Sequence, residues 1–383
     1  MSQIAVSVGH FNGEVFVHVP YVDIASQHVP LKAELMEAVA RVIDHGQFIL
    51  GPEVQEFEQR FAALCGVRYA VAVNSGTDAL TLALRALEIG AGDEVITVPN
   101  SFVASTSCIM LVGARPVFVD VGDDYLMDPE QLERAITPRT RAILPVHLTG
   151  RPADMLAIMD IARTHGLHVV EDCAQAVLAD YKGQRVGSFG VMGCFSLHPL
   201  KTLNACGDGG VLTTSDAELY EKLIALRNIG LQSRDRCVLW SGNSRLDTMQ
   251  AAMLLVKLAY VDDWTVQRRA HARFYQYALS NIPGVRLPCD QPYATAVYHT
   301  FVIQAEQRQT LQQYLTEYGI GTAIHYPVPI HLQPVAAELG YGPGSFPVAE
   351  RQAGRILSLP IYAELQPAAL EYIARSIRRF YRA

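Results

Sequence analysis

The sequence predicts an α/β protein whose larger domain is built on a mostly parallel sheet. Between residues 70 and 214, short runs of β-branched and apolar residues alternate with longer stretches whose apolar residues recur at helical spacing. This alternation is typical of parallel strands joined by helices that cover both faces of a sheet. The rest of the chain predicts long helices and few strands, as in a smaller α+β domain.

The predicted elements follow one another in a regular order along the chain. Two amphipathic helices come first, at residues 31–44 and 53–65. Strands follow at residues 70–73, 94–98, 115–119, 141–145, 167–171, 194–197 and 210–213, with helices at 77–87, 102–112 and 153–164. The C-terminal part predicts a strand at residues 296–304 and helices at 247–261, 266–279, 308–318, 347–356 and 367–380.

Three segments of different character divide the chain. Residues 1–18 are predicted to form an N-terminal extension, in which the alternating segment VFVH suggests an added edge strand. The large domain is expected to span residues 19–255, and the small C-terminal domain residues 256–383.

Composition excludes several classes of protein. Half of the 383 residues are hydrophobic, which is enough for a sizeable core, and the net charge of −7 argues against a nucleic-acid binder. No stretch approaches about 18 uninterrupted apolar residues, and the N-terminus does not resemble a signal peptide. We therefore expect a cytoplasmic protein with no membrane partner. The seven cysteines are scattered without a CxxC pair, which predicts buried thiols in a reducing compartment.

A lysine and an acid point to a particular cofactor. The apolar run GLHVVED ends at Asp172, and 29 residues later Lys201 lies in FSLHPLKTLNACGDGG. Pyridoxal phosphate (PLP) needs a lysine amine that binds its aldehyde and a carboxylate that keeps its pyridine nitrogen protonated. Each residue alone has an ordinary explanation, as a surface charge or as a helix cap. Their order and spacing together favour a PLP site.

A third segment supplies a place for a phosphate. AVAVNSGTDALTLAL predicts a strand, a turn at Ser75, Gly76 and Thr77, and then a helix, whose first N–H groups can bind an anion. Ligands of parallel α/β sheets bind outside the carboxyl ends of the strands. Because Asp172 and the Ser75 turn both follow predicted strands, we expect them in one site.

From about residue 19 onward, the chain resembles the DegT/DnrJ/EryC1/StrS family of PLP-dependent sugar aminotransferases. The resemblance rests on the segments GQFILGPEVQEFE, VPNSFVAST, VHLTGRPADM, EDCAQA, FSLHPLK, GDGG, GNSRLDTMQAA, IHYPVPIHLQP and FPVAERQAGRILSLPIY. It implies PLP fold type I, the fold of aspartate aminotransferase, with a large and a small domain.

The resemblance also implies roles for individual residues. Lys201 would hold PLP covalently and later move a proton, and Asp172 would pair with the protonated pyridine nitrogen. Gln175 would lie beside the ring hydroxyl. Phe102 would stack on the ring, although its segment alone would suggest core packing.

The phosphate and the subunit arrangement follow from the same resemblance. Ser75, Gly76, Thr77 and Ser196 would hold the phosphate within one subunit. Asn243 would reach it from the neighbouring subunit, which implies a homodimer with shared active sites.

Two further residues are implied for the substrate. His325 and Tyr326 would line the sugar side of the pocket. The family is metal-free, and the spacing of His198, His325 and His331 matches no ligand pattern, so no metal is expected.

The implied activity is transfer of an amino group to a nucleotide-linked ketosugar, with L-glutamate as the expected donor. The segment at residues 321–334 looks most like that of members acting at C-3 of dTDP-linked 3-keto-6-deoxyhexoses, while amination at C-4 stays open. A related sugar dehydratase would have histidine in place of Lys201. A non-catalytic regulator is a third alternative, which the complete set of site residues disfavours.

Overall fold

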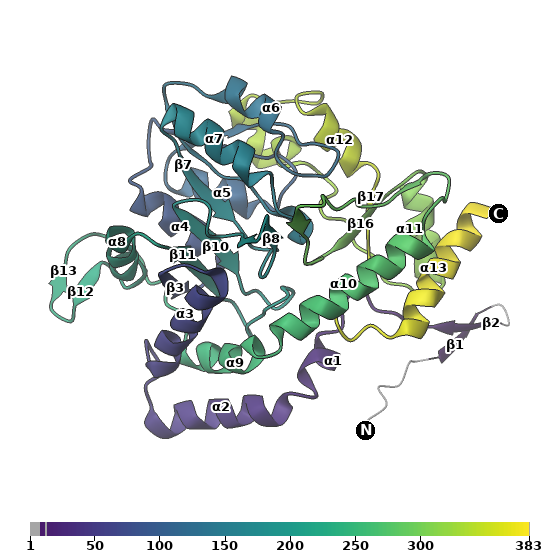
Figure 1. Ribbon diagram of the computed structural model, residues 1–383, viewed down its shortest axis with the longest axis horizontal. Helices are drawn as coiled ribbons and strands as arrows, with labels where there is room; N and C mark the ends of the chain where they lie inside the picture. The colour runs from purple at the N-terminus through teal and green to yellow at the C-terminus, as the bar shows by residue number, and fades with distance from the viewer. Residues whose placement is uncertain (1–7, 12–13, 383) are drawn as a thin grey trace.

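A seven-stranded mixed sheet forms the centre of the larger part of the protein (Figure 1). The computed structural model describes residues 8–11 and 14–382. The strand order is β3-β11-β10-β7-β6-β4-β5, and only β11 runs antiparallel to its neighbours. The strands are β3 (Tyr69–Val73), β4 (Glu94–Thr97), β5 (Arg115–Phe118), β6 (Thr140–Ile143), β7 (His168–Asp172), β10 (Met192–Ser196) and β11 (Gly210–Thr214). Each lies within two residues of its predicted position, which confirms the predicted class of sheet.

Helices cover both faces of this sheet, as the side chains of β3 illustrate. Val71 and Val73 pack into one hydrophobic cluster with α4, whereas Ala70 and Ala72 pack into another with α3 and α9. Alternate residues of a strand point to opposite faces, so β3 is buried from both sides. The helices of this part are α1 (Ile24–His28), α2 (Lys32–His45), α3 (Pro52–Cys65), α4 (Gly76–Ala86), α5 (Ala104–Leu111), α6 (Pro129–Leu132), α7 (Met155–His165), α8 (Ala217–Arg227) and α9 (Thr248–Leu258).

Local signals set the ends of several helices. Pro52 opens α3, where its missing N–H costs no hydrogen bond, and Gly66 ends the helix at a φ of 70°. Asp154 caps α7 by accepting a hydrogen bond from the N–H of Ala157. α8 is absent from the predicted helices, although its leucines at positions 219, 223 and 226 recur at helical spacing.

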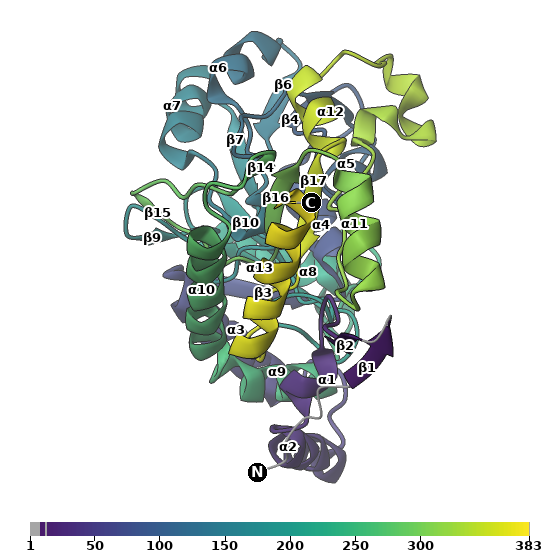
Figure 2. The ribbon, with the colours of Figure 1, turned by 90° about the vertical axis from the view of Figure 1, so that its right-hand side faces the viewer.

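The C-terminal part contains a second, smaller sheet. Strands β14 (Val285–Arg286), β16 (Phe301–Ala305) and β17 (Ile356–Leu359) pair antiparallel in the order β14-β16-β17. The helices of this part are α10 (Val261–Ala278), α11 (Arg308–Glu317), α12 (Pro347–Ala353) and α13 (Pro367–Arg382). α10 and α13 lie side by side in both views (Figures 1 and 2).

Three predicted elements of this part differ from the structure. The helix predicted at residues 266–279 begins earlier, at Val261, as α10. The predicted strand at residues 296–304 is replaced by β15 (Ala294–Thr295), which pairs with β8 (Asp180–Tyr181), and by β16. The predicted helix at residues 347–356 ends at Ala353, and the short apolar run after it forms β17. The division of the chain at residue 255 stays a prediction, since Phe346, Ala349 and Ile356 pack into the hydrophobic cluster of the large sheet.

The described residues 8–11 and 14–17 of the N-terminal extension form a separate pair of strands. β1 (Val8–Phe11) and β2 (Glu14–Val17) pair with each other as a two-stranded sheet, so the predicted strand exists but is not an edge strand of a larger sheet. In the part of the chain that the structure describes, no helix is both long and apolar enough to cross a membrane. All seven cysteines are free; the prediction of buried thiols is wrong for the exposed Cys206, Cys237 and Cys289.

Candidate active site

A cavity of about 410 Å³ lies where β3, β7 and β10 end at their carboxyl sides. It is lined by nearly all of the residues that the sequence singled out. These are Ser75, Gly76, Thr77, Phe102, Asp172, Gln175, Ser196, Lys201, His325 and Tyr326. Asn243 is not among the residues that line it.

Asp172 is the last residue of β7, and its carboxylate is held in a fixed position. Ser105 donates its hydroxyl proton to Oδ2 at 2.7 Å, and the N–H of Ala174 donates to Oδ1 at 3.0 Å. Ser101 supports Ser105 through a second hydroxyl bond of 2.9 Å. The side chain is only 4% exposed, so a cationic ring nitrogen beside it would be strongly stabilised. Asp172 therefore suits the role predicted for it.

Lys201 lies in the loop between β10 and β11, and its amine faces the same cavity. Burial lowers the pKa of Lys201 to about 8, while the charge of Asp172 acts in the opposite direction. A larger share of the amine is therefore neutral near pH 7 than in an exposed lysine, as a nucleophile or a base requires.

The predicted phosphate site is a narrow corner at the start of α4. Ser75 caps the helix by accepting from the N–H of Asp78 at 3.1 Å. The N–H groups of Gly76 and Thr77, which open the helix, have no intrahelical acceptor and can bind an anion. A Cβ on Gly76 would lie 2.7 Å from the Cβ of Ser196, so only glycine allows this close approach. The Ser196 hydroxyl and the helix N-terminus thus meet in a corner that suits an anion.

Aromatic and amide groups line the mouth of the cavity. The Phe102 side chain is 54% exposed, so core packing does not explain it. Its ring centroid lies 5.7 Å from that of Tyr326. Gln175 accepts from the N–H of Thr149 at 2.6 Å and donates to the Tyr326 hydroxyl at 3.4 Å. Burial, followed by the charge of Asp172, raises the pKa of Tyr326 to about 12, so the phenol keeps its proton.

His325 reaches the cavity from the loop after α11. Its Nδ1 lies 2.9 Å from the Ser358 hydroxyl, and its ring lies 5.7 Å from that of Tyr21. Burial, followed by the charge of Lys201, lowers the pKa of His325 to about 4. The imidazole is therefore neutral at pH 7 and available for hydrogen bonding.

Some lining residues were not predicted. Ser105 lies one helical turn after Phe102, and its hydroxyl could have been noticed from that spacing. Tyr21, Arg268 and His299 also line the cavity but come from the N-terminal segment and the C-terminal part. No sequence pattern links these three to the site, because tertiary packing alone brings them there.

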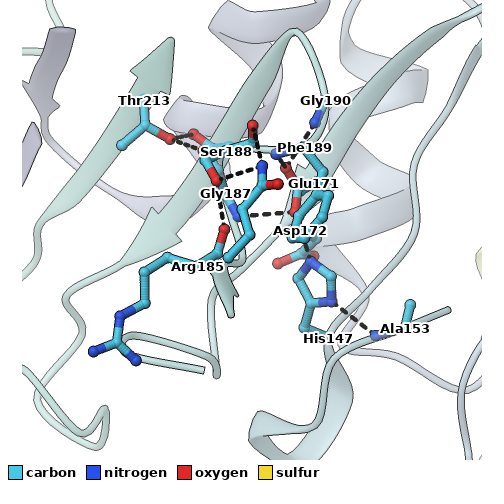
Figure 3. Close-up of polar contacts among 12 residues, drawn as sticks. His147, Ala153, Glu171, Asp172, Arg185, Gly187, Ser188, Phe189, Gly190 and Thr213 are labelled. Atoms are coloured by element: carbon cyan, nitrogen blue, oxygen red, sulfur yellow. Dashed lines mark hydrogen bonds and ion pairs between the residues drawn. The ribbon is translucent and has the colours of Figure 1, made fainter. Parts of the chain in front are cut away.

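Glu171, next to Asp172, belongs to a different network, which Figure 3 shows. Its carboxylate accepts from the N–H groups of Gly187, Phe189 and Gly190 at 2.8–2.9 Å, and Nε2 of His147 lies 3.1 Å away. Within the described residues, one group of three side chains could hold a metal ion, and it consists of His147, Glu171 and Cys173. Since hydrogen bonds already occupy the Glu171 oxygens, we assign these groups a structural role.

The comparisons with known proteins agree with this geometry. A model of the DegT/DnrJ/EryC1/StrS aminotransferase family matches residues 30–378. A dTDP-3-amino-3,4,6-trideoxy-alpha-D-glucose transaminase from Streptomyces venezuelae is 47% identical over 357 residues, covering 93% of this chain and 94% of the relative.

Solved structures show the same similarity. S. venezuelae DesV in complex with ketimine intermediate has a TM-score of 0.94 and 45% identity, covering 96% of this chain and 99% of DesV. The ntda protein of Bacillus subtilis, with bound cofactor PMP (pyridoxamine phosphate), has a TM-score of 0.90 and 28% identity, covering 96% and 86%.

The fold and the cavity define an aminotransferase of PLP fold type I. The chain belongs to the DegT/DnrJ/EryC1/StrS aminotransferase family, which is PLP-dependent. The predicted family, fold type, enzyme class and cofactor are confirmed.

Proposed function

We propose that the enzyme transfers an amino group from L-glutamate to C-3 of a dTDP-linked 3-keto-6-deoxyhexose. The observation that carries the aminotransfer chemistry is the shared cavity of Lys201, with its depressed amine pKa, and the buried carboxylate of Asp172. The name of the S. venezuelae relative supports the C-3 position and the dTDP group. We also propose that the enzyme is cytoplasmic.

The residues divide the work as follows. PLP, when bound, supplies an electron sink next to the carbon that loses or gains the amino group. Asp172, held by Ser105, would keep the ring nitrogen protonated. Lys201 would take up and return the proton on the reacting carbon, for which a pKa of about 8 is well matched to neutral pH. Ser196 and the first amides of α4 would bind the phosphate.

A homodimer with shared sites is part of this proposal. Asn243 pairs with Asn228 in an isolated antiparallel β-bridge and does not line the cavity of its own chain. Both facts are consistent with a role in a partner's cavity. Large apolar side chains are also exposed, as expected of a face that a second subunit covers. They include Phe48, Ile49, Leu50, Leu200, Ile229, Val238 and Trp240. The hairpin of β12 (Leu231–Ser233) and β13 (Arg236–Cys237) lies between Ile229 and Val238 in the sequence and projects from the body (Figure 1).

The test uses the purified protein with PLP. A visible absorbance band is expected on reconstitution, and L-glutamate alone should convert it to the PMP form with release of 2-oxoglutarate. A subsequent 3-keto dTDP-sugar should restore the band and give an aminosugar by mass spectrometry. Failure of glutamate to change the band would overturn glutamate as the donor, and failure of a panel of other amino acids as well would favour a non-catalytic regulator. Loss of a sugar hydroxyl without amine gain would instead indicate a dehydratase.

A further inference from the structure

Lys257, on α9, is a fully buried lysine outside the cavity. Its Nζ donates to the backbone oxygen of Asn204 at 2.9 Å and to Asn204 Oδ1 at 2.8 Å, and lies 3.5 Å from Cys206 Sγ. In the described part of the chain, no carboxylate lies within ion-pair distance of it. Burying an ammonium group costs free energy, and methionine would fill the same space without that cost. The charged group therefore needs an explanation other than packing.

The hydrogen-bond partners of Lys257 lie in the segment that directly follows Lys201. Asn204 is 2% exposed, and its Nδ2 donates to the Lys201 backbone oxygen at 3.0 Å and to Gln27 Oε1 at 2.8 Å. A second residue of α9 holds the same segment, since Gln250 accepts from the N–H of Cys206 at 2.8 Å. α9 therefore contacts the loop that carries Lys201 at two nearby residues, Asn204 and Cys206.

The direction of these hydrogen bonds assigns a specific task to the ammonium group. Lysine offers only donors, so the Asn204 amide must turn its oxygen toward Lys257. The NH₂ group of the same amide then faces the carbonyl of Lys201 and the side chain of Gln27. Without the ammonium group, the amide could rotate by half a turn and present its oxygen to the Lys201 carbonyl, which would repel it.

We propose that Lys257 and Asn204 are positioning residues that fix the backbone of Lys201, so that its amine stays aligned with the cofactor. This inference rests on the function proposed above, in which the Lys201 amine both binds PLP and moves a proton. Neither residue is among those that line the cavity, so their effect on the reaction would be transmitted through the loop that carries Lys201. An error of about 1 Å in the place of a catalytic group can cost about 10²-fold in rate.

The experiment compares Lys257→Met, Asn204→Ala and a matched control, Ile373→Ala. Ile373 is also fully buried, but it lies on α13 in a separate hydrophobic cluster, so its variant loses stability without touching the Lys201 loop. Three quantities are measured: kcat and KM, the pH midpoint of the visible PLP band, and amide hydrogen exchange of residues 198–206 in the PLP-free protein.

Lys257→Met and Asn204→Ala are expected to lower kcat by about 10- to 100-fold with little change in KM. Both should shift the pH midpoint of the PLP band and speed exchange in residues 198–206, and the double variant should be no worse than the more impaired single one. If both variants behave like Ile373→Ala in all three measurements, the positioning role is overturned. Should Lys257→Met not fold, Asn204→Ala decides alone.

The exchange measurement separates this inference from the proposed function. If the wild-type protein showed no transamination, the proposed function would fail. Faster exchange in both variants would still show that Lys257 and Asn204 hold the Lys201 loop in place. If the wild-type enzyme is active and both variants exchange at the wild-type rate, the positioning role of Lys257 and Asn204 is overturned. The aminotransferase function would still stand.

Discussion

Glu171 and Asp172 are adjacent in β7, yet their carboxylates serve opposite sides of the sheet. Glu171 is fully buried and accepts from three backbone N–H groups of residues 187–190, as Figure 3 shows. Asp172 faces the cavity and is held by Ser105. Consecutive strand residues point to opposite faces. Glu171 therefore binds the turn at residues 187–190, while the Asp172 carboxylate faces the cavity in which we propose that the cofactor binds.

This difference predicts different defects in the two variants. Asp172→Asn keeps the shape but removes the charge that would hold the cofactor nitrogen protonated, so turnover should fall by about 10²- to 10³-fold. Glu171→Gln places an NH₂ group among N–H donors and should mainly lower stability, by about 1–3 kcal/mol. Steady-state rates and thermal unfolding of both variants test this. Turnover by Asp172→Asn within a few-fold of wild type would contradict the assigned role.

Lys201→Ala should abolish turnover and still bind PLP or PMP. The Asp172 carboxylate, the phosphate corner at Gly76 and Ser196, and the Phe102 ring do not depend on the covalent bond. Retained cofactor is measured by absorbance after gel filtration, and activity by release of 2-oxoglutarate. Normal transamination by this variant would show that another amine carries the reaction.

The depressed pKa of Lys201 predicts how cofactor capture depends on pH. Its amine has a pKa of about 8 instead of the ordinary 10.5, so the nucleophilic neutral form grows as pH rises toward 8 and dominates above it. The rate of covalent PLP capture should therefore rise about tenfold per pH unit below about 7 and level off above about 9. Stopped-flow absorbance measures it, with Lys201→Ala as the non-covalent baseline. A rate that keeps rising beyond pH 10 would indicate an ordinary, solvated lysine.

Much of the fold and of the candidate active site could be predicted, because the spacing of apolar residues along the sequence determines it. The seven strands and the Ser75 turn are visible as apolar runs that end in polar residues. The Asn204–Lys257 contact joins residues 53 positions apart and leaves no periodic signal. Arg268 likewise reaches the cavity from α10 while Nη1 donates to the Ile361 carbonyl at 2.7 Å. Such contacts are products of tertiary packing, which a single sequence does not encode in its spacing.

Mixed dimers test whether Asn243 acts across the subunit interface. Lys201→Ala and Asn243→Ala should each be defective alone. In a mixed dimer, one site would carry both lesions and the other neither, so random mixing should restore about a quarter of wild-type activity. Subunits with different affinity tags allow the mixed species to be isolated. No recovery in purified mixed dimers would mean that Asn243 serves its own subunit or has no part in the site.

His325 is expected to help position the sugar. Enzymes that aminate C-3 and C-4 must present different parts of the hexose to the same cofactor atom, and we expect the segment around His325 and Tyr326 to determine which carbon is reached. Ser358 engages Nδ1 of His325 at 2.9 Å, which leaves Nε2 of a neutral imidazole for a sugar hydroxyl. Loss of one such hydrogen bond costs about 1–3 kcal/mol, or about 5- to 150-fold in rate.

His325→Ala should therefore lower kcat/KM for a 3-keto dTDP-sugar by about 5- to 150-fold, while the half-reaction with glutamate keeps its wild-type rate. Single-turnover absorbance separates the two half-reactions, and the glutamate half serves as the internal control. Because burial lowers the pKa of His325 to about 4, its contribution to the sugar half-reaction should not vary between pH 6 and 8. Equal loss in both half-reactions would assign His325 to loop packing. Efficient turnover of 4-keto sugars with none of 3-keto sugars would refute the C-3 position and leave the aminotransferase intact.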